Sequence, residues 1–243
     1  MRSLGVIPAR YGSTRLPAKP LKKIADKCLL EWVIEAVHNK TDLDEVIVAT
    51  DHEEIVKVAE AAGVEAVMTD PELASGSDRV YAASKDRGAD IVLNIQGDEP
   101  LVKPEWVNQV VASFKDSSVE MATIATDLEE TDFENMNVVK VICDQNQNAI
   151  YFSRFGIPHS RIGADELTGL SMQHIGLYGF KSEFLARFCD HPRTDLEKAE
   201  SLEQLRAMYM GAKIKVVKVT GQSIGIDTPE DVKTLEAILK GRG

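Results

Sequence analysis

The segment from Pro8 to Pro20 is the first in the chain whose residue types and spacing suit chemistry, because it places Arg10, Arg15 and Lys19 directly after an apolar run. An Arg side chain offers a planar fork to phosphate oxygens, whereas a Lys side chain acts as a compact point charge. The first 25 residues contain six Lys or Arg and no Asp or Glu, while the remainder contains 22 Lys or Arg and 39 Asp or Glu. Local positive charge in an acidic chain predicts a site for a small polyanion held by short-range contacts.

An alternative interpretation is that these cations form a solvated charge cluster without a ligand. The flanking residues favour a structured loop instead, since a buried strand is expected at 4–7 and an amphipathic run follows at 29–37. A strand, a loop and a helix in this order place the loop at the carboxyl edge of an α/β sheet, where ligands bind.

Two acids occupy comparable positions later in the chain. Asp98 follows the apolar run 91–95, and Asp227 lies between a short apolar run and the last predicted helix. Mg²⁺ is commonly held by one or two carboxylates together with substrate phosphates, so the pair fits a metal–nucleotide site. Each acid also has a simpler interpretation, Asp98 as a turn residue and Asp227 as an acid near a helix N-terminus.

The segment Ser75–Arg79 follows a predicted strand at 64–68 and opens a helix. Gly76 permits close backbone approach to a planar base, and exposed N–H groups at a helix start can contact its polar edge. An ordinary N-cap with an incidental Arg79 explains the same residues equally well. The sequence leaves both interpretations open.

The order of the predicted elements favours an α/β fold with a doubly wound, mostly parallel sheet. In the first half, buried strands at 45–50, 64–68 and 91–95 alternate with helices at 29–39, 52–62, 77–86 and 104–114. From about residue 119 the alternation breaks, with strands expected at 121–125, 138–142, 149–152 and 213–219, and helices at 182–190, 195–210 and from Thr228 onward. We therefore predict one domain over 1–243, with an arm or lobe at about 150–195.

The composition excludes several classes of protein. An isoelectric point of about 5.0 argues against nonspecific binding to nucleic acid or anionic membranes. Neither G-x-G-x-x-G nor G-x-x-x-x-G-K-[ST] occurs, which argues against a simple dehydrogenase or a P-loop ATPase. The chain has no apolar stretch of membrane-spanning length and no signal-peptide pattern, so we expect a cytoplasmic protein. Cys28, Cys143 and Cys189 are widely spaced, which predicts reduced thiols.

Taken together, the motifs resemble those of the 3-deoxy-manno-octulosonate (Kdo) cytidylyltransferases. The resemblance runs in order over essentially the whole chain, and its blocks are Pro8–Pro20, Ala49–Asp51, Ser75–Arg79, Gln96–Pro100, Tyr151–Arg154, His174–Gly179, Leu202–Arg206 and Gly225–Asp231. The first block is shared more loosely with sialic-acid cytidylyltransferases, whereas the blocks at 174–179 and 202–206 point to the Kdo enzymes.

The resemblance implies a Rossmann-like nucleotidyltransferase fold with a projecting dimerisation lobe. It also implies a Mg²⁺-dependent reaction of CTP with Kdo that gives CMP-Kdo and pyrophosphate, a homodimer, and a place in lipopolysaccharide biosynthesis. The matching positions imply triphosphate contacts by Arg10, Ser13, Arg15 and Lys19; further nucleotide contacts by Ser75, Gly76, Arg79 and Gln96; metal binding by Asp98 and Asp227; and a sugar pocket of Gln96, Arg154, His174, Tyr178, Glu203 and Gln204. Arg10, Lys19, Asp98 and Asp227 would carry the catalysis.

One departure from the family pattern concerns the identity of the sugar. Many members carry a His two residues before the Ser-Gly pair, where this chain has Leu73. The 8-amino analogue of Kdo is therefore an alternative substrate. Two further alternatives are a sialic-acid-type or sugar-1-phosphate nucleotidylyltransferase and a non-catalytic nucleotide sensor. A sensor would not need its two acids to meet at one cation, so a large separation of Asp98 from Asp227 would favour it.

Overall fold

The computed structural model describes residues 1–12, 16–161, 169–221 and 223–240. The chain forms two compact units, Met1–Asn108 with Gln222–Gly243, and Gln109–Gly221. Compact units can belong to one domain, so the predicted single domain with a lobe at about 150–195 stays a prediction.

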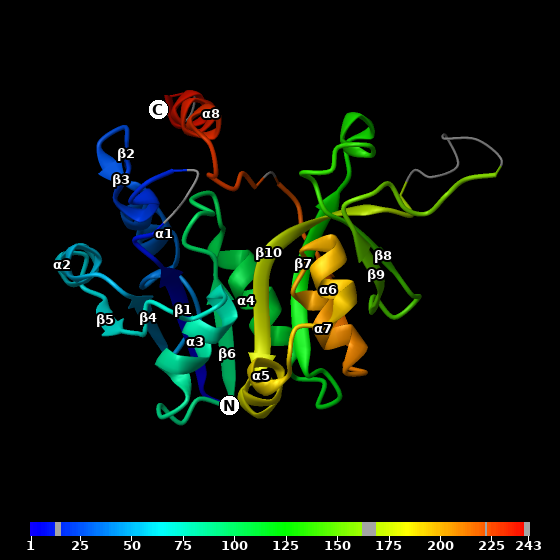
Figure 1. The fold of residues 1–243 in the computed structure, drawn as a ribbon, viewed down its shortest axis with the longest axis horizontal. Coiled ribbons are helices and arrows are strands. Elements are labelled where there is room, and N and C mark those ends of the chain that lie inside the picture. Colours follow the sequence, from blue (N-terminus) through cyan, green and yellow to red (C-terminus); the bar gives the residue numbers. More distant parts are fainter. Residues whose placement is uncertain (13–15, 162–168, 222, 241–243) are drawn as a thin grey trace. The chain divides into compact units, whose positions relative to one another are not determined.

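The first unit is built on four parallel strands, β1 (Ser3–Ala9), β4 (Glu45–Thr50), β5 (Glu65–Met68) and β6 (Ile91–Ile95). Their order is β6-β1-β4-β5, and every neighbouring pair is parallel (Figure 1). The strands β1 and β6 are apolar runs that are buried almost completely, as expected where helices cover both faces of a parallel sheet. The predicted alternation of strands and helices is thereby confirmed for this unit.

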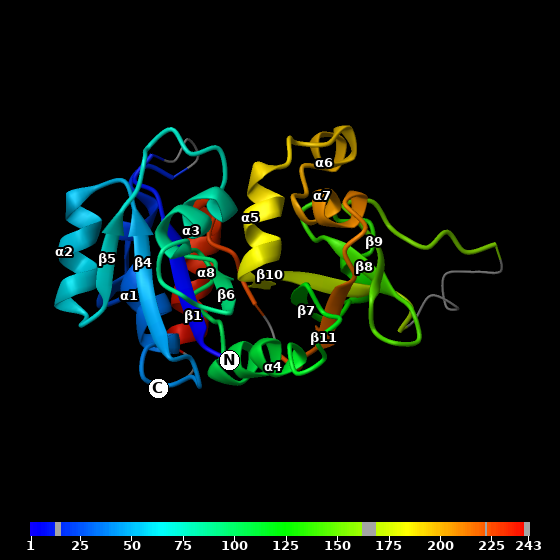
Figure 2. The same cartoon turned by 90° about the horizontal axis from the view of Figure 1, so that it is seen from below.

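Helices connect these strands in the predicted order. The helices α1 (Leu29–Val37) and α2 (Glu53–Ala61) follow β1 and β4, and α3 (Gly76–Ser84) follows β5. Because the chain reverses direction in the sheet after β5, a right-handed crossover places α3 on the face opposite α1, as Figure 2 shows. The reversal makes the gap between the carboxyl ends of β1 and β6 the topological switch point, where ligands bind in such sheets.

Three shorter elements and two helices complete this part of the chain. A 3₁₀ helix, η1 (Lys19–Leu21), precedes a small hairpin of β2 (Lys23–Ile24) and β3 (Lys27–Cys28). The helix α4 (Pro104–Ser113) spans the boundary between the units, and α8 (Pro229–Lys240) returns to the first unit. Leu235 of α8 packs with Ile24 and Leu29 in one buried cluster, which fixes the C-terminal segment beside the start of the chain.

The second unit has a mixed sheet. In it β7 (Met121–Asp127) is parallel to β11 (Ile214–Lys218) and antiparallel to β10 (Met172–Lys181), while β8 (Lys140–Cys143) pairs with both β10 and β9 (Ala149–Ser153). The helices of this unit are α5 (Ser182–Asp190), α6 (Asp195–Glu200) and α7 (Gln204–Tyr209), and a 3₁₀ turn, η2 (Glu130–Asp132), follows β7.

Two expectations are corrected by these elements, and other elements were not expected at all. The predicted helix at 195–210 is two helices, because Ser201 has a left-handed backbone (φ 53°) that ends α6. The strand predicted as buried at 64–68 is an edge strand with exposed residues, since it pairs on one side only. The sequence analysis also missed β10 and the β2–β3 hairpin.

Two expectations from composition can be compared with the structure. None of the helices in the described ranges has the length and apolar character that a bilayer crossing demands. Cys28, Cys143 and Cys189 are reduced thiols, as predicted. Burial raises the pKa of Cys28 and of Cys143 to about 11, so these thiols stay protonated and unreactive at neutral pH.

Candidate functional site

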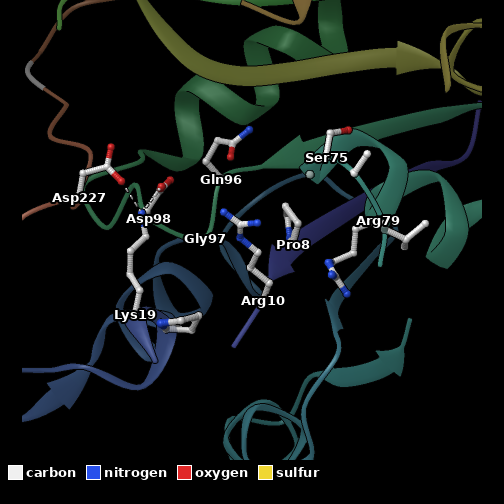
Figure 3. A pocket seen from close by; sticks show the side chains of 13 residues that line it. Pro8, Arg10, Lys19, Ser75, Arg79, Gln96, Gly97, Asp98 and Asp227 are labelled. Carbon is white, nitrogen blue, oxygen red and sulfur yellow. Dashed lines mark hydrogen bonds and ion pairs between the residues drawn. The ribbon is translucent and has the colours of Figure 1, made fainter. Parts of the chain in front are cut away.

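A cavity of about 350 Å³ lies at the switch point of the first unit. It collects residues from the end of β1, from η1, from the start of α3, from the end of β6 and from the segment before α8 (Figure 3). Eight predicted site residues line it: Arg10, Lys19, Ser75, Gly76, Arg79, Gln96, Asp98 and Asp227. Ser13 and Arg15, also predicted for this site, lie outside the described residues.

Lys19 connects the two predicted metal ligands. Its Nζ donates to Asp98 Oδ2 at 2.6 Å and to Asp227 Oδ1 at 2.9 Å, and Figure 3 shows the side chain extending from η1 toward both. Burial alone would lower the pKa of Lys19, but the charges of Asp98 and Asp227 outweigh it and the pKa is raised. The two acids therefore meet at one cation, which is the arrangement that disfavours the sensor alternative.

Backbone contacts hold the two acids in place. The amide of Ile226 donates to the carbonyl of Asp98 at 2.9 Å, which ties the C-terminal segment to the end of β6. Asp231 accepts from the amides of Asp227 and Thr228, at 2.9 and 2.7 Å, and so fixes the turn before α8. These contacts set the position of Asp227 independently of any ligand.

Glu99 is a third acid beside this pair that the sequence analysis did not select. Its carboxylate accepts a hydrogen bond from Ser223 Oγ. Burial, with a further contribution from Asp98, raises the pKa of Glu99 to about 7. A glutamate that directly follows Asp98 at a strand end was the only available signal, and nothing in the sequence indicated its burial.

The two glycines that line the cavity, Gly76 and Gly97, differ in whether the surrounding packing leaves space for a Cβ. A Cβ at Gly97 would lie 2.7 Å from the carbonyl oxygen of Pro8, so the packing of β6 against β1 itself requires a glycine there. A Cβ at Gly76 would meet Pro8 Cγ only at 3.8 Å, an ordinary contact. The protein's own packing therefore does not explain Gly76, which leaves room for a flat group to approach the start of α3.

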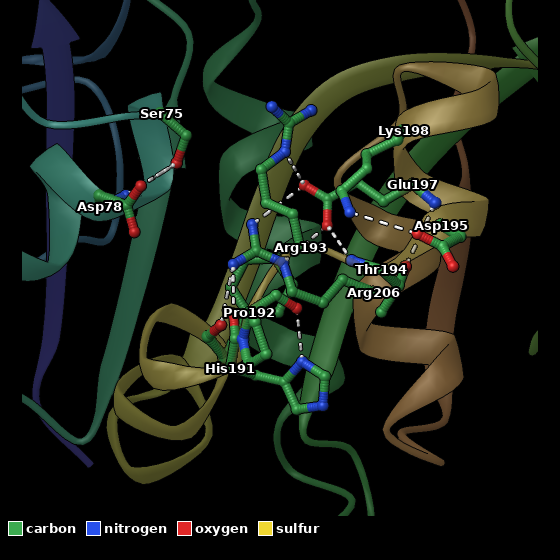
Figure 4. A network of polar contacts seen from close by, with 11 residues as sticks. Ser75, Asp78, His191, Pro192, Arg193, Thr194, Asp195, Glu197, Lys198 and Arg206 are labelled. Atoms are coloured by element: carbon green, nitrogen blue, oxygen red, sulfur yellow. Dashed lines mark hydrogen bonds and ion pairs between the residues drawn. The ribbon is translucent and has the colours of Figure 1, made fainter.

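The start of α3 supports both interpretations of Ser75. Its hydroxyl accepts from the amide of Asp78 at 3.1 Å and donates to Asp78 Oδ2 at 2.8 Å, which is the behaviour of an N-cap (Figure 4). Ser75 nevertheless lines the cavity with Gly76. Capping and base recognition are compatible, since Ser75 caps the helix and lines the cavity from the same turn.

Arg79 lines the cavity but already has partners. Its side chain is 3% exposed, and it donates to Asp51 Oδ2 at 3.2 Å and to Thr69 Oγ1. Burial lowers its pKa below the usual range, and Arg10 lowers it further, while Asp51 raises it. The guanidinium of Arg79 is thus a positive charge fixed at the cavity wall by Asp51 and Thr69.

The second unit contains the other predicted sugar-pocket residues, and three of them form one cluster. The rings of His174 and Tyr178 are 5.4 Å apart, and Tyr178 Oη donates to Gln204 Oε1 at 3.2 Å. Gln204 is 1% exposed, and its Nε2 has no hydrogen-bond partner within the described part of the chain. A buried amide nitrogen without a partner is costly, which makes it a candidate donor to a ligand.

His174 in this cluster is neutral. Burial lowers its pKa to about 3. Its Nε2 lies 2.9 Å from Thr123 Oγ1, whose hydroxyl proton is directed to the carbonyl of Leu177 at 2.8 Å. Nε2 therefore carries the proton and donates to Thr123, leaving Nδ1 as an acceptor. A histidine in this state suits hydrogen bonding better than proton transfer.

Buried ion pairing positions Gln204. Arg206 of α7 contacts the buried Glu197 of α6, with Nε 3.1 Å from Oε2 (Figure 4). Arg206 also donates to the carbonyl of Phe188 at 3.1 Å. Glu197 also forms a capping box with Thr194. These contacts join α5, α6 and α7, so the start of α7 is rigidly placed.

Arg154 and Glu203 complete the predicted set. Arg154 donates through Nε to the carbonyl of Glu200 at 2.9 Å and through Nη1 to that of Met136 at 3.2 Å. Its own carbonyl accepts from the buried Lys140. Glu203 precedes α7 and is half-buried. Their roles in binding a sugar stay predictions.

Comparisons with known proteins agree with this geometry. A family model described as cytidylyltransferase matches residues 4–214. The 3-deoxy-manno-octulosonate cytidylyltransferase of Bdellovibrio bacteriovorus is 48% identical over 246 residues, and that of Bacteroides thetaiotaomicron is 44% identical over 252 residues; each comparison covers the whole of both chains. A solved structure described as CMP:2-keto-3-deoxy-manno-octonic acid synthetase complexed with CTP superposes with a TM-score of 0.94 at 34% identity, covering both chains fully. The predicted fold class is confirmed by this similarity.

Proposed function

The chain belongs to the 3-deoxy-manno-octulosonate cytidylyltransferases, and from this premise we propose that it transfers the cytidylyl group of CTP to Kdo and releases pyrophosphate. The observation that carries the proposal is the cavity of the first unit, where Arg10, Lys19 and two carboxylates converge at the switch point. A triphosphate needs cations along its length, and a developing pyrophosphate leaving group needs them most.

Asp98 and Asp227 would hold the Mg²⁺ ion of this reaction. The support is that both carboxylates contact one ammonium group, so their oxygens already converge on a single cation. Within the described ranges no group of three or more His, Cys, Asp or Glu side chains is arranged for a metal, which leaves the remaining positions to substrate oxygens and water, as is common for Mg²⁺. When bound, Mg²⁺ supplies charge neutralisation and orientation of the reacting oxygens.

The protein side chains would divide the remaining work. Arg10 and Lys19 would bind phosphate oxygens and stabilise the charge on the leaving group, Lys19 exchanging its carboxylate partners for phosphate. The amides at the start of α3 beside Gly76 would contact the cytosine. Holding the α-phosphate in line with the attacking sugar hydroxyl is the main contribution to rate that such a site can make.

The hydroxyl groups of the sugar would be bound by neutral donors and acceptors of the second unit. Gln204 Nε2, which has no partner among the described residues, is a candidate donor, and the neutral ring of His174 keeps one acceptor nitrogen; both suit sugar hydroxyls. Arg154 would contact the sugar carboxylate. We also propose that the protein acts in the cytoplasm as a homodimer in lipopolysaccharide biosynthesis, which follows from the family resemblance and is testable by light scattering and by complementation.

Pyrophosphate release tests the activity directly. The purified protein is given CTP and Mg²⁺ with Kdo, its 8-amino analogue or sialic acid in parallel, and ATP and UTP replace CTP as controls. We expect release with CTP and Kdo. Preference for the 8-amino analogue would assign the sugar specificity differently, with Leu73 at the cavity wall as the first residue to examine. Absence of release with all three sugars would overturn the proposal.

A further inference from the structure

Asp51 belongs to a sequence block, Ala49–Asp51, to which the predicted site gives no role. It is the first residue after β4, and because Thr50 is in register with Ala9 of β1, it lies beside the start of the basic segment at Arg10. Its side chain is 10% exposed. An acid buried at the carboxyl edge of the sheet needs partners, and the described residues supply two of them.

The two oxygens of Asp51 contact two different parts of the cavity wall. Oδ1 accepts from the backbone amide of Tyr11 at 2.8 Å, and Oδ2 accepts from Arg79 Nη2 at 3.2 Å. The other terminal nitrogen of Arg79 donates to Thr69 Oγ1, whose hydroxyl donates to the carbonyl of Thr50 at 2.9 Å. One carboxylate thus joins the residue after Arg10 to a cation on α3.

The charges around Asp51 explain why an acid is placed there. Arg10 and Arg79 both line the cavity, and each disfavours the charge of the other, as the lowering of the pKa of Arg79 by Arg10 reflects. Asp51 acts in the opposite direction on Arg79. Without a counter-charge, two guanidinium groups in one cavity would repel and separate before any anion is bound.

We propose that Asp51 is a positioning residue of the nucleotide pocket: it holds the backbone at Tyr11 so that Arg10 faces the cavity, and it balances Arg79 so that both cations are presented to one polyphosphate. The inference rests on the proposed function for the identity of the nucleotide, but its chemistry concerns any polyphosphate. Asp51 itself does not contact the reacting groups.

Two substitutions of Asp51 distinguish the effect of its contact with the Tyr11 amide from the effect of its negative charge. Asp51→Asn keeps an oxygen for the Tyr11 amide and removes the negative charge, whereas Asp51→Ala removes both. Asp44 is the matched control, because it lies directly before β4, accepts from the amide of Ser3 at 2.8 Å, and is at the other end of the same strands. Asp44→Asn and Asp44→Ala therefore make the same two changes at a comparable carboxylate–amide contact away from the cavity.

Binding of CTP and of inorganic tripolyphosphate is measured by calorimetry on all five proteins, together with thermal unfolding and the KM for each substrate. We expect Asp51→Asn to weaken both ligands by about tenfold and Asp51→Ala by more, with KM for CTP rising while KM for the sugar stays within about twofold. The Asp44 variants should bind both ligands as the wild type does, whatever stability they lose.

The proposal is overturned if the Asp51 variants lose stability like the Asp44 variants but keep wild-type affinity for both ligands, since Asp51 would then be a structural contact only. A wild-type protein that binds tripolyphosphate but not CTP would contradict the proposed function and still support Asp51, provided that the Asp51 variants bind tripolyphosphate more weakly. A wild-type protein that binds neither ligand overturns both.

Discussion

The cavity of the first unit and the cluster of His174, Tyr178 and Gln204 in the second unit are both polar, but the cavity contains ionised side chains and the cluster contains neutral ones. In the cavity, formal charges are kept and balanced against one another, as in the contacts of Lys19 with Asp98 and Asp227. In the cluster, burial keeps the imidazole of His174 neutral, and its neighbours Tyr178 and Gln204 carry no charge. A charged cavity suits a charged ligand that arrives with its own cations, and a neutral cluster suits hydroxyl groups.

The largest effect should follow from removing one acid of the cavity. Asp98→Asn keeps the shape of the side chain but removes a charge that the metal needs, so we expect kcat to fall by about a thousandfold or more while the melting temperature changes little. Asp90→Asn is the control, because Asp90 lies before the opposite end of the same strand, β6, where it accepts from the Arg2 amide at 2.7 Å, and it does not line the cavity. Unchanged turnover in Asp98→Asn would remove Asp98 from the proposed metal site.

Substitution of Lys19 should weaken the binding of CTP and strengthen the binding of a metal ion. Lys19→Met removes a phosphate contact, so the Kd for CTP should rise by about thirtyfold, equivalent to about 2 kcal/mol. It also frees Asp98 and Asp227 of a competing ammonium, so Mn²⁺ should bind the nucleotide-free protein more tightly, as measured by electron paramagnetic resonance. Lys22→Met, two residues beyond the segment Pro8–Pro20 and exposed, should change neither. Weaker Mn²⁺ binding in Lys19→Met would mean that Lys19 and the metal do not share these acids.

Much of the cavity could be predicted from sequence because parallel strands make local signals coincide in space. β1 and β6 were recognisable as apolar runs, and the polar residues after them, such as Arg10 and Asp98, necessarily meet at one sheet edge. The roles of Glu99 and Asp51 could not be predicted, since they depend on contacts with Ser223, Tyr11 and Arg79 that no local pattern encodes.

The second unit was harder to predict, and β10 shows why. Its sequence contains Gly176 and Gly179 and polar residues at 173 and 174, which weaken a strand pattern. The structure requires a glycine at position 179, because a Cβ there would lie 2.7 Å from Val110 Cγ1. In addition, a register shift between Ile175 and Tyr178 interrupts the alternation of side chains between the two faces of the strand. Tertiary packing overrides local propensity at this strand.

The neutral state of His174 predicts a pH effect on stability. Its pKa is about 3 in the folded protein, against an ordinary value of 6.5, so the unfolded chain binds the extra proton first. Stability should therefore be fully present above about pH 6.5 and fall as the pH is lowered toward 3, with a loss of about 2 kcal/mol by pH 5 from this residue. Urea unfolding of wild type and His174→Gln at pH 7.5 and 5 measures it.

The control for that measurement is a histidine outside the cluster. His38→Gln should leave the difference between the two pH values as large as in the wild type, whereas His174→Gln should reduce it. An equal loss of stability in wild type and His174→Gln would show that His174 takes up its proton equally in the folded and the unfolded state, and the contrast between the charged cavity and the neutral cluster would then fail.

The smallest expected effect tests the neutral cluster itself. Gln204→Leu removes a buried amide whose Nε2 has no partner in the described part of the chain, so the free protein should lose little stability or gain some, while KM for the sugar rises by about tenfold. KM for CTP should stay unchanged, because the cavity residues are untouched. Tyr178→Phe removes the hydroxyl that donates to Gln204 and keeps the ring, so it should raise the sugar KM less. A rise in KM for CTP instead of the sugar would assign Gln204 to the nucleotide, and the division of charged and neutral recognition between the two regions would have to be abandoned.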